Sequence, residues 1–546
     1  MHFAAVSCLF LACLAALLSS CAAPIQSPGA RHDIVIYGGT SAGVAAAVAA
    51  ARAGRSVVLI EPTQHLGGLS SSGLGATDIG NKSAIGGIAR EFYRRVRSHY
   101  DDRAAWTWES REEFKGHGHP AGEDAAWTFE PHVAEKIFLD LVARERIDVV
   151  LGERLELGRV VPLRDRRITS IEMESGRRFE GTYFIDATYE GDLLARAGVS
   201  FHVGREPNAR YGETLNGVQT RNATKHQFRQ RVDPYVKPGD PSSGLVWGVS
   251  AEQPAAEGEG DAHVQAYCFR LCATDVAENR IPWAKPADYD PARYELLLRY
   301  FEAGETMAPW HPLFMPNRKT DANNNGAFSF DMIGAADRYA QANWAERARI
   351  VAAHESYQNG LLWALANEPR VPQAVREEFQ RFGLPKDEFR DNGGWPRLLY
   401  IREARRMIGE YVMTEHECRG ARVAPRSIGL AAYTMDSHNV QRYVDSSGAV
   451  RNEGDVQVGG FPPYAIDYGA ILPKREQCRN LFVPVCMSSS HIAYGSIRME
   501  PVFMVLGESA AIAASLAIVQ GLDPHELEYD DLRARLLAAG QVLDAR

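Results

Sequence analysis

Residues 33–62, DIVIYGGTSAGVAAAVAAARAGRSVVLIEP, constrain the fold more than any other part of this sequence. Ile34–Tyr37 is a short apolar segment that predicts a strand, and it runs directly into a pair of glycines. The alanine- and valine-rich run Val44–Ala53 has strong helix propensity, and Arg55–Ile60 predicts a second strand. We therefore expect a strand, a tight turn, a helix and a second strand within one unit of about thirty residues.

The glycine turn of this unit has the chemistry of a dinucleotide site. A tight turn and close helix packing require small residues, and the helix N-terminus offers free N–H groups and a positive dipole end to a pyrophosphate. Glu61 follows about twenty residues later, where an acid can accept the ribose hydroxyls. Thr40 occupies the usual middle-glycine position, so its side chain must point away from the phosphates. The predicted cofactor contacts are Gly38, Gly39, Thr40, Ser41, Ala42, Gly43 and Glu61. A purely structural strand–helix–strand unit is the alternative.

A second glycine-rich stretch, HLGGLSSSGLGATDIG at 65–80, has too many glycines and serines for a regular element. It resembles the segment of glutathione-reductase-type flavin enzymes that passes along the pyrophosphate and ribityl chain. A nicotinamide-binding domain does not need a second glycine-rich segment, so the stretch favours FAD. The alternative is that the stretch is only a flexible loop. The residues expected to contact the cofactor here are Gly67, Gly68, Leu69 and Ser70.

Two distant segments match the same kind of site. Residues 182–187 predict a buried strand, and the turn that follows resembles the one that closes over the flavin in this superfamily; its expected contacts are Ala187, Thr188, Gly191 and Asp192. Residues 480–486 predict another buried strand, and a long alanine-rich helix is expected from Pro501, which suits a first helical turn.

These segments predict an α/β protein in which a glutathione-reductase-type, Rossmann-like FAD-binding domain is split by an inserted α+β substrate domain. At 546 residues the chain is long enough for more than one domain. The expected divisions are 31–204 and 395–521 for the two halves of the FAD domain, 205–394 for the insertion and 522–546 for a C-terminal helix.

Several longer motifs resemble the FAD-dependent oxidoreductase family of secreted bacterial proteins, sometimes labelled as related to xanthan lyase. They lie at 37–43, 129–138, 186–199, 204–213, 319–331, 400–409, 435–442 and 488–514 and cover nearly the whole chain after its first thirty residues. The turn sequence Gly-Gly-Thr, rather than Gly-Gly-Gly, is what resembles this family, so Thr40 is compatible with FAD. The resemblance implies flavin chemistry but no substrate. Related heterodisulfide-reductase-like flavoproteins carry 4Fe-4S clusters, which need about four closely spaced thiolates, and no such run occurs here.

Tyr400–Val412 predicts a helix, because its apolar residues repeat with helical spacing. Arg405 falls within the apolar stripe, so it must meet a carboxylate, carbonyls or an anion, either as a structural ion pair or near flavin or substrate. Arg402 lies at the edge of that stripe, and Arg406 is expected to pair with Glu410 on the wet face.

His491 and Arg498 lie in the segment that, in this fold class, passes close to the flavin ring. A histidine near neutral pKa suits the base that removes a proton while hydride passes to flavin N5. An arginine there could hold a substrate carboxylate or the charge of reduced flavin. His438, beside Asp436, is a second candidate base. Core or surface roles remain open for both histidines.

The insertion contains a strand-like run at 263–274 and a polar loop that could face the ligand. The polar residues of that loop are Lys319, Asp321, Asn323 and Asn324, and the adjoining Asn325-Gly326 is equally a hairpin-turn signal. Cys268 and Cys272 are expected to be core thiols. With no C-x-x-C pair in the sequence, we expect no metal site built from cysteines.

The N-terminal segment predicts export. Phe3–Leu18 is an apolar run too short for a comfortable membrane span, and Leu-Ser-Ser-Cys follows it. Residues 1–21 thus resemble a lipoprotein signal, with a lipid on Cys21 and a tether at 22–31, in a periplasmic or outer-membrane protein of a bacterium. An uncleaved anchor helix is the alternative.

The formal charge of −9 and the absence of dense Lys/Arg runs argue against a nucleic-acid partner. The leading hypothesis is an exported FAD oxidoreductase that acts on a small polar molecule, for example a carbohydrate-derived one, and passes electrons to an unknown acceptor. A non-catalytic flavin-fold binding module and a heterodisulfide-reductase-like redox partner are the alternatives.

Overall fold

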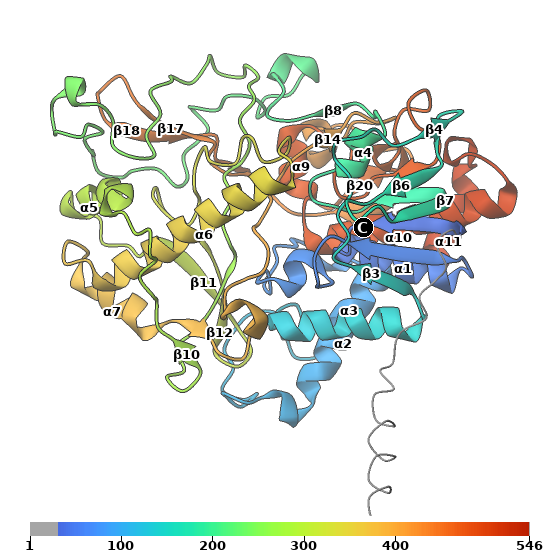
Figure 1. Cartoon of the computed structure of the whole chain (residues 1–546), viewed down its shortest axis with the longest axis horizontal. Coiled ribbons are helices and arrows are strands. Elements are labelled where there is room, and N and C mark those ends of the chain that lie inside the picture. Colours follow the sequence, from blue (N-terminus) through green and yellow to red (C-terminus); the bar gives the residue numbers. More distant parts are fainter. Residues whose placement is uncertain (1–30, 545–546) are drawn as a thin grey trace, which may run out of the picture.

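The computed structural model describes residues 31–544. The predicted signal at 1–21, its lipidated Cys21 and all but the last residue of the tether lie outside the described residues. The described chain is a mixed α/β structure in which a parallel sheet and its helices lie on one side, and the inserted elements lie on the other (Figure 1).

A parallel sheet forms the centre of the side of the molecule opposite the insertion. Its strand order is β21-β7-β1-β2-β3, so a strand from near the C-terminus completes a sheet begun by the N-terminal segment. These are mostly apolar strands, as expected where both faces are covered. Their bounds are β1 (Arg31–Tyr37), β2 (Val57–Glu61), β3 (Asp148–Leu151), β7 (Arg178–Asp186) and β21 (Leu481–Phe482), with β6 (Ser170–Glu172) antiparallel to β7.

Two buried helices pack against each other below this sheet. These are α1 (Ser41–Arg52) and α10 (Glu500–Gln520), and Gly507 allows their close approach, since a Cβ there would lie 2.2 Å from the carbonyl O of Ala42. Among the described residues, α10 alone is long and apolar enough to cross a membrane, but 83% of its apolar window is buried inside the protein. The predicted helix from Pro501 is therefore confirmed as a core helix.

Further helices and short strands complete this side of the molecule. The helices are α2 (Gly87–Asp101), α3 (Pro131–Arg144), α4 (Asp192–Arg196), α8 (Glu415–Cys418), α9 (His491–Ile497) and α11 (Tyr529–Ala538). The paired strands are β4 (Leu163–Arg164) with β5 (Arg167–Ile168), β8 (Phe201–His202) with β14 (Arg406–Met407), and β15 (Ser427–Ala431) with β20 (Tyr464–Asp467).

The insertion combines a small antiparallel sheet with three helices (Figure 1). Its strands are β9 (Leu271–Thr274), β11 (Trp310–Met315) and β12 (Lys319–Asn324), with the pair β10 (Arg280–Ile281) and β13 (Leu384–Pro385); its helices are α5 (Glu295–Glu302), α6 (Trp344–Asn367) and α7 (Gln373–Arg381). Only the last four residues of the strand-like run 263–274 form a strand. The β11–β12 turn lies at 316–318, so Asn325-Gly326 is not the hairpin turn.

Part of the predicted second FAD half lies against the insertion. β16 (Met435–Ser437) pairs with β19 (Val456–Val458), and β17 (Gln441–Val444) pairs with β18 (Val450–Glu453). From this hairpin, Arg442 Nη2 donates to the carbonyl O of Ala327 at 2.9 Å. The domain boundaries stay predictions, but Arg442 and Glu453 of this segment contact residues of the insertion.

The predicted helix Tyr400–Val412 is wrong. The segment is irregular except for the two residues of β14, and its backbone N–H groups bond to other parts of the chain, as when Tyr400 donates to Cys268 and Ile408 to Ser200. Arg406 is fully buried and pairs with Glu206 rather than Glu410. The segment carries four buried charged side chains whose partners lie on several sides, and one apolar helix stripe cannot satisfy such a set.

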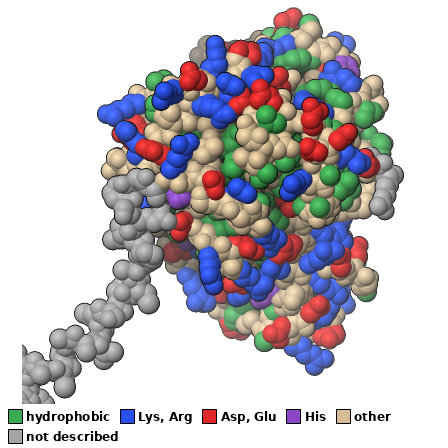
Figure 2. Space-filling view, turned by 90° about the vertical axis from the view of Figure 1, so that its right-hand side faces the viewer, with side chains coloured by type: hydrophobic (Ala, Val, Ile, Leu, Met, Phe, Trp, Pro, Cys, Tyr) green, Lys and Arg blue, Asp and Glu red, His purple; other side chains and the backbone are tan. Residues whose placement is uncertain are grey.

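All five cysteines of the described residues are free and buried, which confirms the core thiols expected for Cys268 and Cys272. Burial raises the pKa of the Cys268 thiol to about 12. On the face shown in Figure 2, basic and acidic side chains are interspersed.

Candidate functional site

The turn between β1 and α1 is shaped by glycines that no other residue can replace without a clash. Gly38 has a φ of 105°, and a Cβ there would lie 2.7 Å from the backbone carbon of Ala187. A Cβ on Gly43 would lie 1.8 Å from the carbonyl O of Gly38. The turn therefore brings the N-terminus of α1 directly beneath the ends of β1 and β7, with N–H groups that have no intrahelical acceptor.

The contacts of Thr40 explain why a residue with a side chain can occupy this position of the glycine turn. Its hydroxyl donates to the carbonyl O of Ala187 at 2.7 Å and accepts from the N–H of Gly43 at 3.3 Å, which caps α1. The side chain is thus turned toward β7 and its own helix. Ser41 and Ala42 are the first two residues of that helix, and both are buried.

Glu61 ends β2 beside this turn. Its carboxylate accepts from the N–H of Gly39 at 2.6 Å and from that of Thr63 at 2.8 Å. Burial raises its pKa to about 6, and the hydrogen bonds from Thr63 and Gly39 offset part of that rise. The acid is therefore held in a fixed position next to the glycine turn, as the sequence predicts.

The second glycine segment touches the first. The N–H of Gly67 donates to the carbonyl O of Gly39 at 2.8 Å, and both Gly67 and Gly68 have positive φ values, of 99° and 58°. Ser70 and Leu69 follow in a buried single turn. We call residues 38–43, Glu61 and residues 67–70 the nucleotide cradle.

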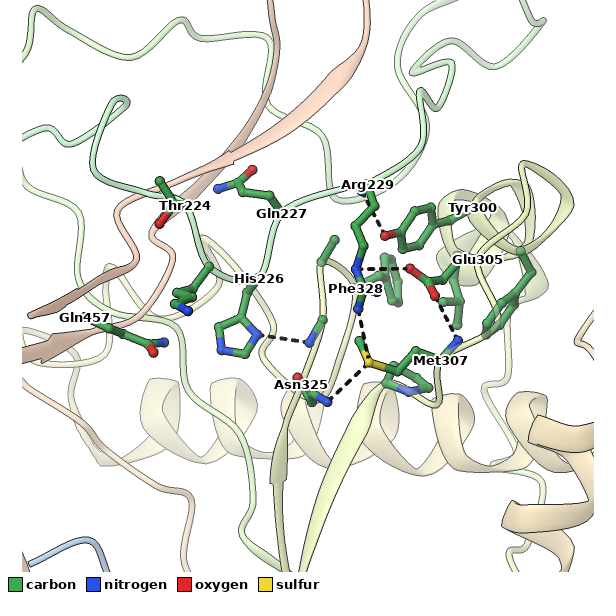
Figure 3. A pocket seen from close by; sticks show the side chains of 16 residues that line it. Thr224, His226, Gln227, Arg229, Tyr300, Glu305, Met307, Asn325, Phe328 and Gln457 are labelled. Atoms are coloured by element: carbon green, nitrogen blue, oxygen red, sulfur yellow. Dashed lines mark hydrogen bonds and ion pairs between the residues drawn. The ribbon is translucent and has the colours of Figure 1, made fainter.

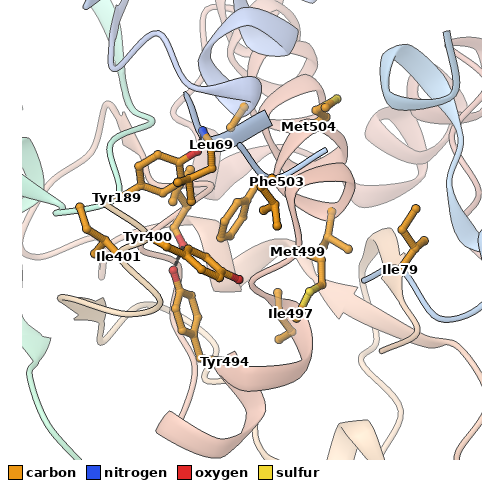
Figure 4. Packing of buried hydrophobic residues seen from close by; sticks show 14 of the residues in the cluster. Leu69, Ile79, Tyr189, Tyr400, Ile401, Tyr494, Ile497, Met499, Phe503 and Met504 are labelled. Carbon is orange, nitrogen blue, oxygen red and sulfur yellow. Dashed lines mark hydrogen bonds between the residues drawn. The ribbon is translucent and has the colours of Figure 1, made fainter. Parts of the chain in front are cut away.

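A buried carboxylate lies against this cradle. Glu500, at the start of α10, accepts hydrogen bonds from the hydroxyls of Ser41 (2.6 Å), Ser70 (3.3 Å) and Tyr189 (2.7 Å). Burial raises its pKa to about 7, and no Lys or Arg of the described residues forms an ion pair with it. Figure 4 shows Tyr189 and Leu69 beside Phe503 of α10, and the Tyr189 hydroxyl also accepts from the N–H of Leu69 at 2.9 Å. The sequence analysis did not single out Glu500, although this residue lies within the motif at 488–514.

In the turn after β7, the side chains of Thr188 and Asp192 are already engaged in contacts within the protein. Thr188 donates from its hydroxyl to Asp186 at 2.7 Å, and Gly191 has a φ of 68°. The carboxylate of Asp192 pairs with Arg347 of α6 at 2.6 Å and with Arg405 at 2.9 Å. The sequence left two roles open for Arg405, and the structure shows the buried ion pair. The Asp192 carboxylate is the partner in that pair, so it has a structural role.

His491 begins α9 and is paired with a carboxylate that sequence reasoning missed. Its ring Nδ1 lies 2.8 and 3.0 Å from the two oxygens of Glu403, and its backbone N–H donates to Glu206. Nε2 makes no hydrogen bond to the described residues. Burial alone would raise the pKa of Glu403, but His491 and Arg406 lower it to about 2. Glu403 accepts a hydrogen bond from Nδ1–H, so Nε2 is the ring nitrogen that remains available to a substrate.

A second pair involves His438 and Arg402. Both contact Asp331 of the insertion: His438 Nδ1 lies 2.8 Å from Oδ2 and Arg402 Nη1 lies 2.8 Å from Oδ1. Burial would raise the pKa of Asp331, but Arg402 and His438 lower it below its usual range. Burial and Arg402 lower the pKa of His438 to about 3, so His438 is neutral at physiological pH.

Gln265 links the two histidine pairs. Its Nε2 donates to Glu403 at 3.0 Å, and its Oε1 accepts from the backbone N–H of His438 at 3.2 Å. We call this set the charged network; its members are Gln265, Asp331, Arg402, Glu403, Asp436, His438, His491 and Arg498.

Arg498 closes the network at the end of α9. It donates to the hydroxyl of Tyr400 at 2.7 Å and to the backbone carbonyl O of Asp436 at 3.1 Å, while its buried Nε has no partner among the described residues. Tyr400 lies among the aromatic side chains at the start of α10 (Figure 4). Burial raises the pKa of Asp436 to about 6, although Arg498 opposes the rise. Four of the five predicted catalytic residues therefore meet in one network, and Arg405 does not.

The residues predicted as a polar loop, 319–324, form strand β12 instead, and their side chains have structural partners. Lys319 is fully buried and pairs with Glu130 and Glu388, each at 2.7 Å, and Asp321 pairs with Arg270 at 2.7 Å. Glu130 and Glu388, with His132, are the one group of carboxylates and imidazole in the described residues spaced to hold a metal ion. The Lys319 ammonium already supplies positive charge there, so this group carries no metal assignment. Of these four predicted residues, Asn324 alone reaches the charged network, accepting from Arg402 at 3.2 Å.

The cradle fits a dinucleotide. Gly38 and Gly43 stand where a Cβ would collide with backbone, as the tight turn of a dinucleotide site requires, and Glu61 stands where such a site recognises a ribose. The hydroxyls of Ser41 and Ser70 donate hydrogen bonds to the Glu500 carboxyl group beside the start of α1. FAD bound here would supply hydride chemistry next to the charged network.

The family of this chain follows from its sequence. The sequence model of the family described as FAD dependent oxidoreductase matches residues 33–536. No curated protein matches. Solved structures with partial likeness include L-proline dehydrogenase from P. horikoshii (14% identity, 32% of this chain and 58% of that one, TM-score 0.23). Others are 3-ketosteroid-delta4-(5alpha)-dehydrogenase from Rhodococcus jostii RHA1 (15%, 31% and 48%, 0.20) and T. acidophilum thioredoxin reductase (18%, 33% and 40%, 0.18).

These alignments span less than two thirds of each of those three proteins, and their TM-scores are too low to carry an argument about this chain. The family match has no such restriction, since it covers nearly all of the described residues. It agrees with the glycine cradle, the ribose acid and the parallel sheet described above. The chain belongs to the family of FAD-dependent oxidoreductases.

Proposed function

We propose that this enzyme oxidises a small polar molecule at the charged network, with hydride passing from a substrate carbon to N5 of FAD. The accompanying proton leaves the substrate oxygen or nitrogen for Nε2 of His491. The His491–Glu403 contact carries this proposal, because a buried carboxylate that accepts from Nδ1 both fixes the tautomer and stabilises the imidazolium formed.

The remaining members of the network suit substrate positioning. Arg498 carries a buried Nε without a partner and holds Tyr400 at its other end. A buried guanidinium donor without a partner is costly, and an anionic oxygen of the substrate would satisfy it. Arg402 is already neutralised by Asp331, so its role is to keep Asp331 ionised and His438 in place.

The test has two steps. Alcohols, amines and sugar acids are first screened under anaerobic conditions for bleaching of the flavin absorbance. With the substrate so found, His491→Gln is expected to slow flavin reduction by about 100-fold or more, the range of general-base catalysis, with unchanged FAD content. Glu403→Gln should shift the pH profile of the same step. An unaltered rate in His491→Gln would exclude His491 as the base.

His311→Gln is the matched control, since His311 is exposed on β11 and its side chain makes no hydrogen bond or ion pair with the described residues. It should leave the rate unchanged. A colourless protein after supplementation with FAD would contradict the cofactor itself.

We further propose that the chain is exported and anchored through a lipid on Cys21. The apolar run Phe3–Leu18 followed by Leu-Ser-Ser-Cys supports this. Mass spectrometry of protein from a bacterial membrane fraction should show an N-terminal diacylated Cys21, and Cys21→Ser should release the protein from that fraction. An unprocessed N-terminus would contradict lipidation.

A further inference from the structure

Glu500, at the start of α10, is a buried carboxyl group in direct contact with the nucleotide cradle. It is 1% exposed, and the hydroxyls of Ser41 and Ser70 both donate to its Oε2, at 2.6 and 3.3 Å. Its Oε1 accepts from the hydroxyl of Tyr189 at 2.7 Å. No backbone N–H, Lys or Arg within residues 31–544 makes a hydrogen bond or ion pair with this carboxyl group. The oxidation proposed above gives Glu500 no role.

Glu305, which lines an open pocket of about 430 Å³ in the insertion, is by contrast a carboxylate that stays ionised (Figure 3). Its Oε2 lies 3.7 Å from Nε of Arg229, and its Oε1 accepts from the N–H groups of Thr306 and Met307. Burial would raise its pKa, but hydrogen bonds, first that from Met307, lower it below its usual value. Burial raises the pKa of Glu500 to about 7, so Glu500 can take up a proton near neutral pH.

The hydroxyl protons of Ser41 and Ser70 can each serve only one acceptor at a time. A serine hydroxyl has a single proton to donate, and an ionised carboxylate can only accept. While Glu500 is ionised, it uses both hydroxyl protons, so neither is available to an oxygen of the cofactor. A protonated Glu500 carries an O–H of its own, which can donate to Oγ of Ser41. The proton of the Ser41 hydroxyl is then free for an acceptor on FAD.

The charge of the cofactor favours the same protonation state of Glu500. Ser41 and Ala42 begin α1, and the first N–H groups of a helix have no acceptor within it. Such a helix start binds anions, and in a dinucleotide site the anion is the diphosphate. An ionised Glu500 held against Ser41 would repel the diphosphate, whereas a neutral carboxyl group would not. Protonation therefore removes a repulsive charge and frees a hydrogen-bond donor together.

The titratable side chains around Glu500 do not change charge in the same pH range. Tyr189 follows β7 and donates its hydroxyl to Glu500, and the charge of Glu500 acts on Tyr93 of α2. Burial raises the pKa of both phenols above the usual range, so neither ionises near neutral pH. Glu61, the acid of the cradle, has a pKa raised by burial to about 6 and is mostly ionised at pH 7. A change between pH 7 and pH 9 at this site therefore reports on Glu500.

We propose that Glu500 is a cofactor-binding residue that acts in its protonated form, so that the chain takes up one proton from solvent at Glu500 when FAD binds. The carboxyl O–H donates to Oγ of Ser41, and the Ser41 hydroxyl donates to an anionic oxygen of FAD. Because burial raises the pKa of Glu500 to about 7 before FAD binds, the affinity for FAD falls as the pH rises above 7. This inference concerns cofactor binding and does not depend on which residue removes the substrate proton.

The test is dilution of the FAD-loaded full chain at pH 7 and at pH 9, with the released FAD measured by its fluorescence. Uptake of one proton raises the dissociation constant by up to about tenfold per pH unit, so we expect a value at least about tenfold higher at pH 9. Glu500→Gln has the shape of the protonated side chain and an N–H that can donate to Ser41. Its dissociation constant should differ by less than about twofold between the two pH values.

Glu508→Gln is the matched control, because Glu508 lies on the same helix, is 3% exposed and also has a pKa raised to about 7 by burial. Its partners are the N–H of Ile88 and Nε2 of Gln541 rather than the cradle, so the variant should keep the pH dependence of the unmodified chain. A dissociation constant of the unmodified chain that is the same at both pH values would overturn the proposal without any variant. So would an undiminished pH dependence in Glu500→Gln, or its loss in Glu508→Gln.

Discussion

The nucleotide cradle and the charged network are built by opposite means. The cradle consists mainly of backbone: its glycines leave no room for a Cβ, and its parts come from 33 consecutive positions, 38 to 70. The network consists of side chains, and it gathers Asp331 from the insertion, Arg402 from an irregular segment and His491 from α9. The first binds through shape, and the second depends on balanced buried charge.

This difference means that the two regions should fail differently. A change in the cradle should remove FAD, because close approach of the backbone is lost. A change in the network should cost stability or turnover while FAD stays bound. The following variants separate these outcomes, beginning with the largest expected effect.

Arg402→Met should lower the free energy of unfolding by about 3–5 kcal/mol, because it leaves the buried Asp331 without its guanidinium partner. Urea titration measures the loss, and flavin absorbance of the purified protein should persist. Arg338→Met is the control: Arg338 is 84% exposed in its pair with Glu346, so the change should be below about 1 kcal/mol. Equal effects of both variants would contradict a structural role for the buried pair.

Gly43→Ala should cost about 3 kcal/mol and abolish FAD binding, since the new Cβ would lie 1.8 Å from the carbonyl O of Gly38. The ratio of flavin to protein absorbance measures cofactor loss, and thermal melting measures stability. Gly54→Ala is the comparison, because Gly54 has a φ of 72° but open space around it; backbone strain alone should cost about 1 kcal/mol with FAD retained. Retention of FAD by Gly43→Ala would show that the cradle tolerates a wider turn.

Glu500→Gln should change the pH dependence of stability. Because burial raises the pKa of Glu500 from 4.5 to about 7, the penalty for ionising it grows as pH rises through this range and is complete above about 7. The variant should therefore gain about 2 kcal/mol over the unmodified chain between pH 5 and pH 8. Urea titrations at both values provide the comparison, and a difference independent of pH would rule out a buried ionisation at this residue.

Thr40→Val should lower stability by about 1 kcal/mol, because it removes the cap of α1 and the hydrogen bond to Ala187. Thr40→Ser keeps the hydroxyl and should lose little. Both variants should bind FAD, since the Thr40 side chain points away from the turn's open side. If Thr40→Val lost FAD while Thr40→Ser kept it, the hydroxyl would have to be counted as a cofactor contact.

Much of the cradle could be predicted because local sequence carries it. The glycines, Glu61 and the apolar strands are close in sequence, and backbone geometry limits which residues can occupy such a turn. The long helix α10 and the buried cysteines were predicted for similar reasons of local propensity and composition. His491 and Arg498 were proposed from their place in the fold class, Arg402 from the apolar spacing of residues 400–412, and His438 from its neighbour Asp436.

The partners could not be predicted, since Glu403, Asp331 and Gln265 are far apart in sequence and meet only after folding. The segment around residues 400–412 illustrates the limit. Its apolar spacing indicates a helix, but burial of its charged side chains on several sides requires an irregular path with backbone hydrogen bonds to other segments.

The sequence alone determined the glycine turn and the acid beside it, because these are properties of a short backbone turn and the small residues that permit it. Only the tertiary structure decided which carboxylate each histidine meets and that Arg405 is engaged in a structural ion pair. Those features depend on charges that must find partners wherever the folded chain brings them, since a buried charge without a partner is too costly to keep.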